Sequence, residues 1–425
     1  MKALELRITN FDILMKCELF ELDNGLRIAF QEDSSIQTVH CGFLINAGSR
    51  DELENEHGLA HLIEHCLFKG TANRKAFHIL SRLDSVGGEI NAYTTKEETC
   101  VYASSMNEHF HRASELLFDI VFAASFPDKE IAKEISVIRD EINSYKDNPD
   151  EMLMDEFEEK LFPNHPFGRT ILGTETGISQ LNQQNIRSFV DRLYSTDQIV
   201  FSCVGNISRK KLMRFATEYL EKIPKRIRGN IDRTIPKTTV FDETNKRNVN
   251  QVHTLLGGTS VGLSDDKRSH MILLNNILGG PALNSRLNLN IREKLGYCYH
   301  IESNFNPYSD LGVFQIYFGT DPAYYKRTSK LVRKEMNDLM DKALTPRALA
   351  MAQKQLLGQI ALPQEQRSSI MISTAKSLLH FGRLDTFEEV EEKIMEINAS
   401  DLQSMAIESF QPNRLSSLSF IPEKQ

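Results

Sequence analysis

Three segments in the first half of this 425-residue chain recur, in the same order, in the second half. Val39-His40, which precede a glycine-containing strand and a helix, match Val252-His253. Residues 126–142 match residues 344–360, and residues 193–205 match residues 409–421. An ordered internal repeat predicts two units with the same fold. The alternative is chance similarity between two segments that both alternate strands with helices.

The length of the chain also favours two domains, because single hydrophobic cores seldom grow to this size. Between Lys222 and Asn250 the sequence mixes proline, glycine, threonine and charged residues without a clear period, which is typical of a linker. We therefore predict a first domain at residues 1–222, a linker at 223–248 and a second domain at 249–425.

Hydrophobic periodicity predicts the fold class. Residues 26–30 and 39–45 alternate with the period of two expected for strands, and helical spacing begins at about Asn55. Strands and helices alternate from there on. The pattern predicts an α+β protein in which each domain has a mixed, mostly antiparallel sheet with helices packed on it.

Charge and composition exclude several classes of protein. The net charge of -8 and the lack of a long Lys/Arg cluster argue against nucleic-acid binding. No apolar stretch approaches the roughly 20 residues of a membrane helix, and the N-terminal residues lack a signal-peptide pattern. Six cysteines without CxxC spacing favour reduced thiols over disulfides. We therefore expect a soluble, cytoplasmic protein that binds neither nucleic acid nor membranes.

The segment HLIEH at residues 61–65 is the strongest chemical signal. At about 100° per residue, His61, Glu64 and His65 share one face of a helix, and the opposite face is apolar: Leu59, Leu62, Ile63 and Cys66. Two histidines at positions i and i+4 can bind one zinc ion and leave the glutamate beside it as a base. A polar helix surface is the alternative interpretation.

A catalytic zinc site of this type needs a third protein ligand from elsewhere in the chain. Glu141 is the best candidate, on a helix whose isoleucines mark a buried stripe: Ile131, Ile135, Ile138 and Ile142. Glu134 lies two turns earlier on nearly the same side and is predicted to orient the ligands. In the second copy of the repeat Gln359 and Ala352 replace these acids, so we expect zinc in the first domain only.

Four blocks of sequence, at residues 47–71, 87–103, 134–142 and 277–301, resemble the pitrilysin family of zinc metallopeptidases. That family includes insulin-degrading enzyme, mitochondrial processing peptidase and small two-domain bacterial peptidases. The resemblance extends over nearly the whole chain. It implies the fold of the LuxS and processing-peptidase type, in two homologous domains.

The resemblance also implies roles for individual residues. His61, His65 and Glu141 correspond to the ligands of one zinc ion per chain, and Glu64 to the catalytic base that activates the attacking water. Asn91-Ala92 correspond to the edge strand that binds extended substrates. In the second domain, Arg292 and Tyr299 correspond to residues that bind substrate and stabilise the transition state. Without the resemblance Arg292 is an ordinary helix charge, Tyr299 a core-edge aromatic residue and Asn91 a turn residue.

A member of this family is expected to be a zinc-dependent endopeptidase that hydrolyses peptides or unfolded polypeptides in an enclosed chamber. The resemblance implies a homodimer that forms a clamshell, and it leaves open whether Arg292 and Tyr299 serve the zinc of their own chain or of the partner. A catalytically silent peptide-binding or scaffold subunit is the main alternative. A zinc hydrolase of another substrate, such as an amidase, is the second.

Overall fold

Two compact units make up the protein in the computed structural model, which describes residues 2–3, 17–228 and 233–423. Unit 1 consists of Met1–Ile142, Arg169–Asp232 and Pro363–Leu384, and unit 2 of the three segments Asn143–Gly168, Arg233–Leu362 and Asp385–Gln425.

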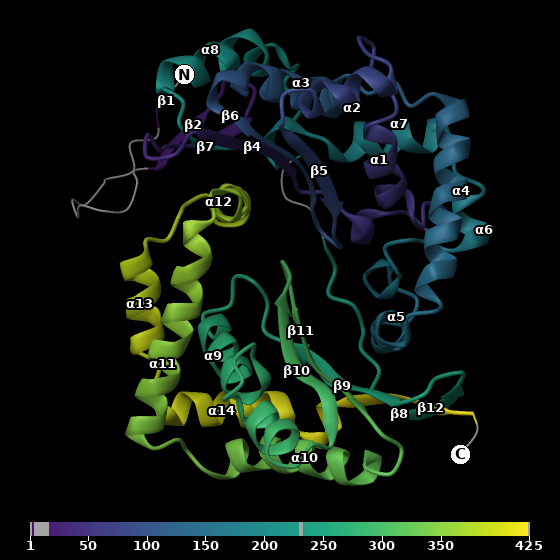
Figure 1. Ribbon diagram of the computed structural model, residues 1–425, viewed down its shortest axis with the longest axis vertical. Coiled ribbons are helices and arrows are strands. Elements are labelled where there is room, and N and C mark those ends of the chain that lie inside the picture. The colour runs from purple at the N-terminus through teal and green to yellow at the C-terminus, as the bar shows by residue number, and fades with distance from the viewer. Residues whose placement is uncertain (1, 4–16, 229–232, 424–425) are drawn as a thin grey trace. The chain divides into compact units, whose positions relative to one another are not determined.

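The sheet of unit 1 has the strand order β1-β2-β3-β7-β4-β6-β5 (Figure 1). Its strands are β1 (Lys2–Ala3), β2 (Cys17–Glu21), β3 (Arg27–Glu32), β4 (Thr38–Ile45), β5 (Glu89–Thr94), β6 (Thr99–Met106) and β7 (Ile199–Gly205). Only β3 and β7 pair in parallel, and all other neighbours are antiparallel. β5 is the last strand at one edge of the sheet.

Helices cover both faces of this sheet. They are α1 (Leu59–Leu67), α2 (Ala76–Asp84), α3 (Phe110–Phe122), α4 (Asp128–Tyr145), α6 (Glu175–Ile178), α7 (Gln183–Leu193), α8 (Arg209–Glu218) and α12 (Arg367–Phe381). Phe43 on β4 joins the larger core with α1, α3, α7 and α8. Its neighbour Leu44 points the other way and packs against Ala375 and Leu378 of α12. Alternate residues of the central strands are therefore buried on opposite faces.

Unit 2 contains a five-stranded sheet in the order β10-β11-β9-β12-β8. Its strands are β8 (Asp242–Arg247), β9 (Val252–Ser260), β10 (Cys298–Pro307), β11 (Gly312–Thr320) and β12 (Ser416–Pro422). β8 and β12 form its one parallel pair.

Helices also lie on both faces of the second sheet. They are α5 (Pro149–Leu161), α9 (Arg268–Gly279), α10 (Tyr325–Asp341), α11 (Pro346–Ala361), α13 (Phe387–Met395) and α14 (Ala399–Phe410). Five of them share a core with Phe314 and Ile316 of β11. α5 covers the opposite face, where Phe157 packs near Leu255 and Leu418.

Five strands of the first sheet, β3-β7-β4-β6-β5, have the same order as the five strands of the second, which confirms the predicted fold of two similar sheet-and-helix domains; β1 and β2 extend the first sheet only. Each sheet has one parallel pair at corresponding positions, and the hairpin β5–β6 corresponds to the hairpin β10–β11. The matched segments of the sequence repeat lie in equivalent elements, namely β4 and β9, α4 and α11, and β7 and β12.

The compact units do not follow a single cut in the sequence. α5 comes from the first half of the chain but belongs to unit 2, and α12 comes from the second half but belongs to unit 1. Each covers a sheet face that would otherwise expose apolar residues to water. The predicted division at residues 1–222, 223–248 and 249–425 assigns α5 to the first domain and α12 to the second. In addition, β8 occupies the end of the predicted linker.

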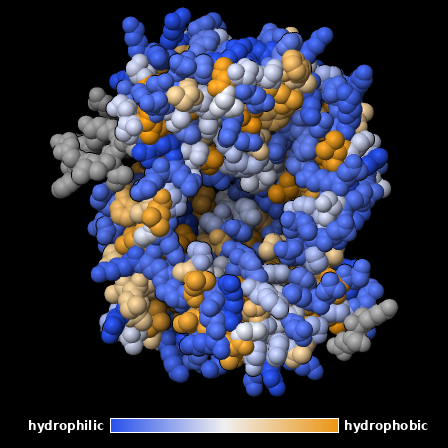
Figure 2. Space-filling view, in the orientation of Figure 1, coloured by the Kyte–Doolittle hydropathy of each residue, from blue (hydrophilic) through white to orange (hydrophobic). Residues whose placement is uncertain are grey.

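None of the helices in the described ranges combines the length and the apolar character needed to cross a membrane. On the face shown in Figure 2, hydrophilic side chains predominate and apolar ones are scattered among them. All six cysteines have free thiols, and all except Cys17 are buried.

Candidate metal centre

One face of α1 carries three side chains that can take part in metal or proton chemistry: His61, Glu64 and His65. The opposite face consists of apolar residues without exposed surface, namely Leu59, Leu62, Ile63 and Cys66. Burial of this face fixes the rotation of the helix about its axis, so the three polar side chains point together to the other side. The structure has the amphipathic arrangement predicted from the sequence.

A second element, α4, brings two acids to the same place. Ile131 and Ile138 anchor it in the core, and Glu134 is buried between them. The side chain of Glu141, two turns after Glu134, retains 37 % of its exposure. Both acids lie on the side of α4 that faces the histidines of α1.

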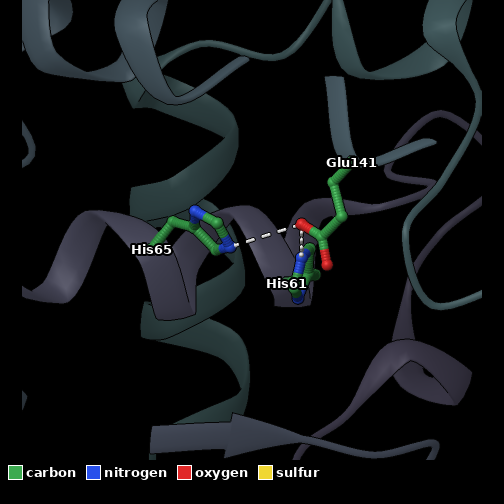
Figure 3. A group of neighbouring side chains, drawn as sticks. All are labelled: His61, His65 and Glu141. Carbon is green, nitrogen blue, oxygen red and sulfur yellow. Dashed lines mark hydrogen bonds and ion pairs between the residues drawn. The ribbon is translucent and has the colours of Figure 1, made fainter. Parts of the chain in front are cut away.

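His61, His65 and Glu141 converge, with one potential ligand atom of each within 4.8 Å of the others. Oε2 of Glu141 lies 3.2 Å from Nε2 of His61 and 3.8 Å from Nε2 of His65 (Figure 3). Among the described residues, no other group of histidine, cysteine and acidic side chains meets this criterion.

This donor set fits zinc. Two imidazole nitrogens and one carboxylate oxygen are a ligand combination found in catalytic zinc sites, which keep a fourth position open. Bonds of about 2.1 Å in a tetrahedral arrangement separate neighbouring ligand atoms by about 3.4 Å. The two distances to Glu141 lie close to that value, so small side-chain movements suffice to bind the ion.

Glu64 lies beside these ligands, with Oε2 3.7 Å from Nδ1 of His61. Burial by itself raises the pKa of Glu64, but the nearby side chains of His61 and Thr94 outweigh it and lower the pKa below the ordinary value. Burial by itself lowers the pKa of His61, but the neighbouring carboxylates of Glu64 and Glu141 outweigh it and raise the pKa. Glu64 is therefore ionised at neutral pH, as a proton acceptor must be.

Glu134 contacts the other ring nitrogen of His65. Its Oε2 lies 3.2 Å from Nδ1, while its Oε1 lies 2.8 Å from Nζ of Lys69. When Nδ1 of His65 donates its proton to this carboxylate, Nε2 is left free to bind a metal. Lys69 was not among the residues predicted from the sequence, although its position four residues after His65 was a usable signal.

The start of α1 is held by Glu52, which was also not predicted from the sequence. Both carboxylate oxygens of Glu52 accept backbone N–H bonds, from Gly58 at 3.0 Å and from Ala60 at 2.8 Å. Burial raises the pKa of Glu52 to about 8 despite these bonds. Gly58 has φ +90, and a Cβ there would lie 2.8 Å from the carbonyl oxygen of Leu172. No periodic pattern pointed to Glu52, because it precedes the helix in an irregular loop.

The loop before α1 is bound to the turn that joins β5 to β6. The amides of Ser49 and Arg50 donate to the carbonyls of Thr95 and Lys96, and Nη1 of Arg50 lies 2.6 Å from Oε1 of Glu97. These bonds connect the helix of the histidines to the edge strand that carries the predicted substrate-binding residues.

Those residues, Asn91 and Ala92, lie in the middle of β5. Asn91 is exposed and Ala92 half-buried. β6 occupies one side of β5, and the sheet of unit 1 ends at its other side. The main chain of β5 is therefore placed where an extended peptide can add as a further strand.

Arg292 and Tyr299 belong to unit 2. Arg292 lies in a π-helix (Asn288–Glu293), with Nε 3.8 Å from Oε1 of Glu293. Tyr299 is near the start of β10 and is 77 % exposed. Glu335 of α10 holds the π-helix by accepting a hydrogen bond from Asn290. Both predicted residues are thus on the surface, which disfavours the core-edge interpretation of Tyr299.

Comparison with protein-family models gives two adjacent matches. The model described as Insulinase (Peptidase family M16) matches residues 27–175, and the model described as Peptidase M16 inactive domain matches residues 180–356. The first range contains His61, His65 and Glu141, and the second contains Arg292 and Tyr299.

Relatives with similar sequences are named as proteases. The chain is 31% identical over 384 residues to an uncharacterized zinc protease of Bacillus subtilis, YmxG, a match that covers 90% of this chain and 92% of that protein. It is 30% identical to an uncharacterized zinc protease of Streptomyces coelicolor, over 91% of this chain and 85% of the relative.

Solved structures share the fold at lower identity. A protease from Helicobacter pylori aligns with a TM-score of 0.89 and 21% identity, covering 96% of this chain and 100% of the other. A structure from Pseudomonas fluorescens described as a peptidase M16 inactive domain aligns with a TM-score of 0.89 and 19% identity, covering 96% and 98%.

Proposed function

Because the chain belongs to the insulinase family of peptidases, M16, we propose that it is a zinc-dependent endopeptidase acting on peptides or unfolded polypeptides. The observation that carries the proposal is the convergence of His61, His65 and Glu141 beside the carboxylate of Glu64. A surface cluster without a function would not require two imidazoles, a carboxylate placed to bind the same metal ion and a second, ionised carboxylate on one pair of helices.

In this proposal His61, His65 and Glu141 hold one zinc ion per chain. Bound there, zinc would supply a Lewis acid that activates water and polarises the scissile carbonyl. Glu64 accepts the proton of the attacking water and returns it to the leaving amine, as the lowered pKa of its carboxyl allows. Glu134 keeps the ring of His65 in one orientation and tautomer.

Substrate binding in the proposal uses the free edge of β5 around Asn91 and Ala92. Hydrogen bonds to an extended backbone give affinity without recognising side chains. The expected substrates are therefore extended or unfolded chains of varied sequence. Arg292 and Tyr299 are proposed to bind substrate and to stabilise the charge that develops on the carbonyl oxygen.

The proposal is tested by metal content and by cleavage of a library of quenched fluorescent peptides. We expect about one zinc ion per chain, and turnover that disappears when a chelator removes the metal. Glu64→Gln should retain zinc but lose turnover, because glutamine cannot accept the proton. Zinc binding without turnover in the unmodified protein would instead support a silent peptide-binding subunit, and turnover that survives Glu64→Gln would refute the assigned base.

A homodimer that encloses its substrates as a clamshell is the quaternary part of the proposal. Light scattering tests the dimer, and a comparison of folded with unfolded forms of one substrate tests the enclosure. Mixing Glu64→Gln chains with Tyr299→Phe chains tests whether Tyr299 serves the partner's zinc site. Recovery of activity in the mixture indicates action on the partner, whereas no recovery indicates action within one chain.

A further inference from the structure

Lys69 lies two residues after the end of α1 and contacts the acid that supports His65. Its Nζ is 2.8 Å from Oε1 of Glu134, and its backbone N–H donates to the carbonyl of Cys66. The lysine side chain is only 29% exposed and that of Glu134 6%. The contact is therefore largely shielded from water, unlike an ordinary surface ion pair.

Together these groups form a chain of contacts that ends at the metal ligands. One oxygen of Glu134 meets Lys69, and the other lies 3.2 Å from Nδ1 of His65. Nε2 of His65 in turn faces Glu141 at 3.8 Å. Both oxygens of the buried carboxylate are thus engaged, and each contact limits its rotation.

We propose that Lys69 is a positioning residue for the metal centre: by holding Glu134 it fixes the ring orientation of His65. The proposal rests on the proposed zinc binding by His61, His65 and Glu141. Without Lys69, one oxygen of Glu134 loses its charged partner and the carboxylate can rotate. It then no longer holds its other oxygen against Nδ1, and His65 gains rotational freedom that metal binding must remove.

Simple electrostatics predicts the opposite result, which makes the proposal decidable. A lysine ammonium near a divalent cation repels it, so loss of that charge should strengthen metal binding. If Lys69 acts by positioning, its loss should weaken metal binding. The sign of the change therefore separates the two effects.

The experiment measures the affinity of the full chain for Zn²⁺ by competition with a chelator, together with the visible absorption of bound Co²⁺. Lys69→Met should weaken zinc binding about ten-fold, at the lower end of the range for residues that support metal ligands, and should change the Co²⁺ spectrum. Lys69→Arg should keep the zinc affinity and the Co²⁺ spectrum of the unmodified chain, because arginine can also donate to Glu134. Lys133→Met is the matched control, because Lys133 forms a similar contact on α4, 2.8 Å from Oε1 of Glu130.

A double variant tests the route through Glu134. In a Glu134→Gln background, adding Lys69→Met should change zinc affinity by less than about two-fold, since the intermediary is already altered. Unchanged or tighter zinc binding by Lys69→Met would overturn the proposed role of Lys69. So would an equal loss of affinity in the unmodified and Glu134→Gln backgrounds. Neither result would contradict the proposed zinc site itself. If the unmodified chain binds neither Zn²⁺ nor Co²⁺, the proposed function fails as well. Should Lys69→Met not fold, Lys69→Gln decides by the same comparison.

Discussion

Replacing Arg50 by methionine is expected to destabilise unit 1 by about 3–5 kcal/mol, the usual cost of removing one partner from a buried ion pair. Nη1 of Arg50 lies 2.6 Å from Oε1 of Glu97, and the two side chains are only 2% and 5% exposed. Methionine fills a similar volume but leaves the buried carboxylate without this partner. The carboxylate cannot regain water without opening the loop before α1.

Thermal unfolding followed by circular dichroism measures the effect. For a unit of 150–250 residues each kcal/mol shifts Tm by about 2–4 °C, so the expected decrease is about 6–20 °C. Arg214→Met is the control in the same unit. It removes an exposed ion pair to Glu218 at 3.9 Å, and such pairs contribute about 1 kcal/mol or less.

A second substitution checks the cause of the loss. Adding Glu97→Gln to Arg50→Met removes the buried charge that has lost Arg50 and should recover part of the lost Tm. The reasoning is refuted if Arg50→Met unfolds within a few degrees of the Arg214→Met control, or if Glu97→Gln brings no recovery.

Three further substitutions probe the site and its support. Glu141→Gln should weaken zinc binding by more than about 100-fold in a chelator competition, because it removes a ligand, whereas loss of an outer partner costs about 10–100-fold; an affinity near that of the unmodified chain would exclude Glu141 as a ligand. Gly58→Ala should lower Tm far more than Gly87→Ala, because both residues have positive φ but only the Cβ at Gly58 collides with backbone; equal effects would contradict this. Burial raises the pKa of Glu52 to about 8 from an ordinary 4.5, so the folded state retains a proton that the unfolded state loses. The stability from Glu52 is therefore complete below about pH 4.5 and declines as pH rises through 8; Tm measured from pH 5 to 9 should fall relative to Glu52→Gln, and parallel curves would refute the raised pKa.

The exchange of α5 and α12 shows where prediction of the domains from sequence reached its limit. Hydrophobic periodicity reports that a helix has a buried face, but it does not report which sheet buries that face. α5 follows residues 126–142 and α12 follows the matching residues 344–360, so each helix comes after the same segment of the repeat and packs on the sheet of the other unit. Only the packing of Ala375 and Leu378 on one sheet, and of Phe157 on the other, assigns each helix to its unit.

Much of the site followed from spacing within single helices. The four-residue interval between His61 and His65 and the seven-residue interval between Glu134 and Glu141 each place two side chains on one helix face, because helical geometry is local. The internal repeat also predicted the topology that the two sheets share, because similar segments in the same order fold alike.

The convergence of α1 with α4 depends on contacts between residues that are distant in sequence. The same is true of the contacts that hold the loop before α1. Glu141 lies 80 positions after His61, and Arg50 lies 47 before Glu97. No periodic pattern records such pairs, because the distance between two elements is determined by how their apolar faces pack. The sequence thus determined which side chains were available for a metal and for proton transfer. The tertiary structure decided that three of them meet within 4.8 Å, and that Glu52, Lys69 and Arg50 support the elements that carry them.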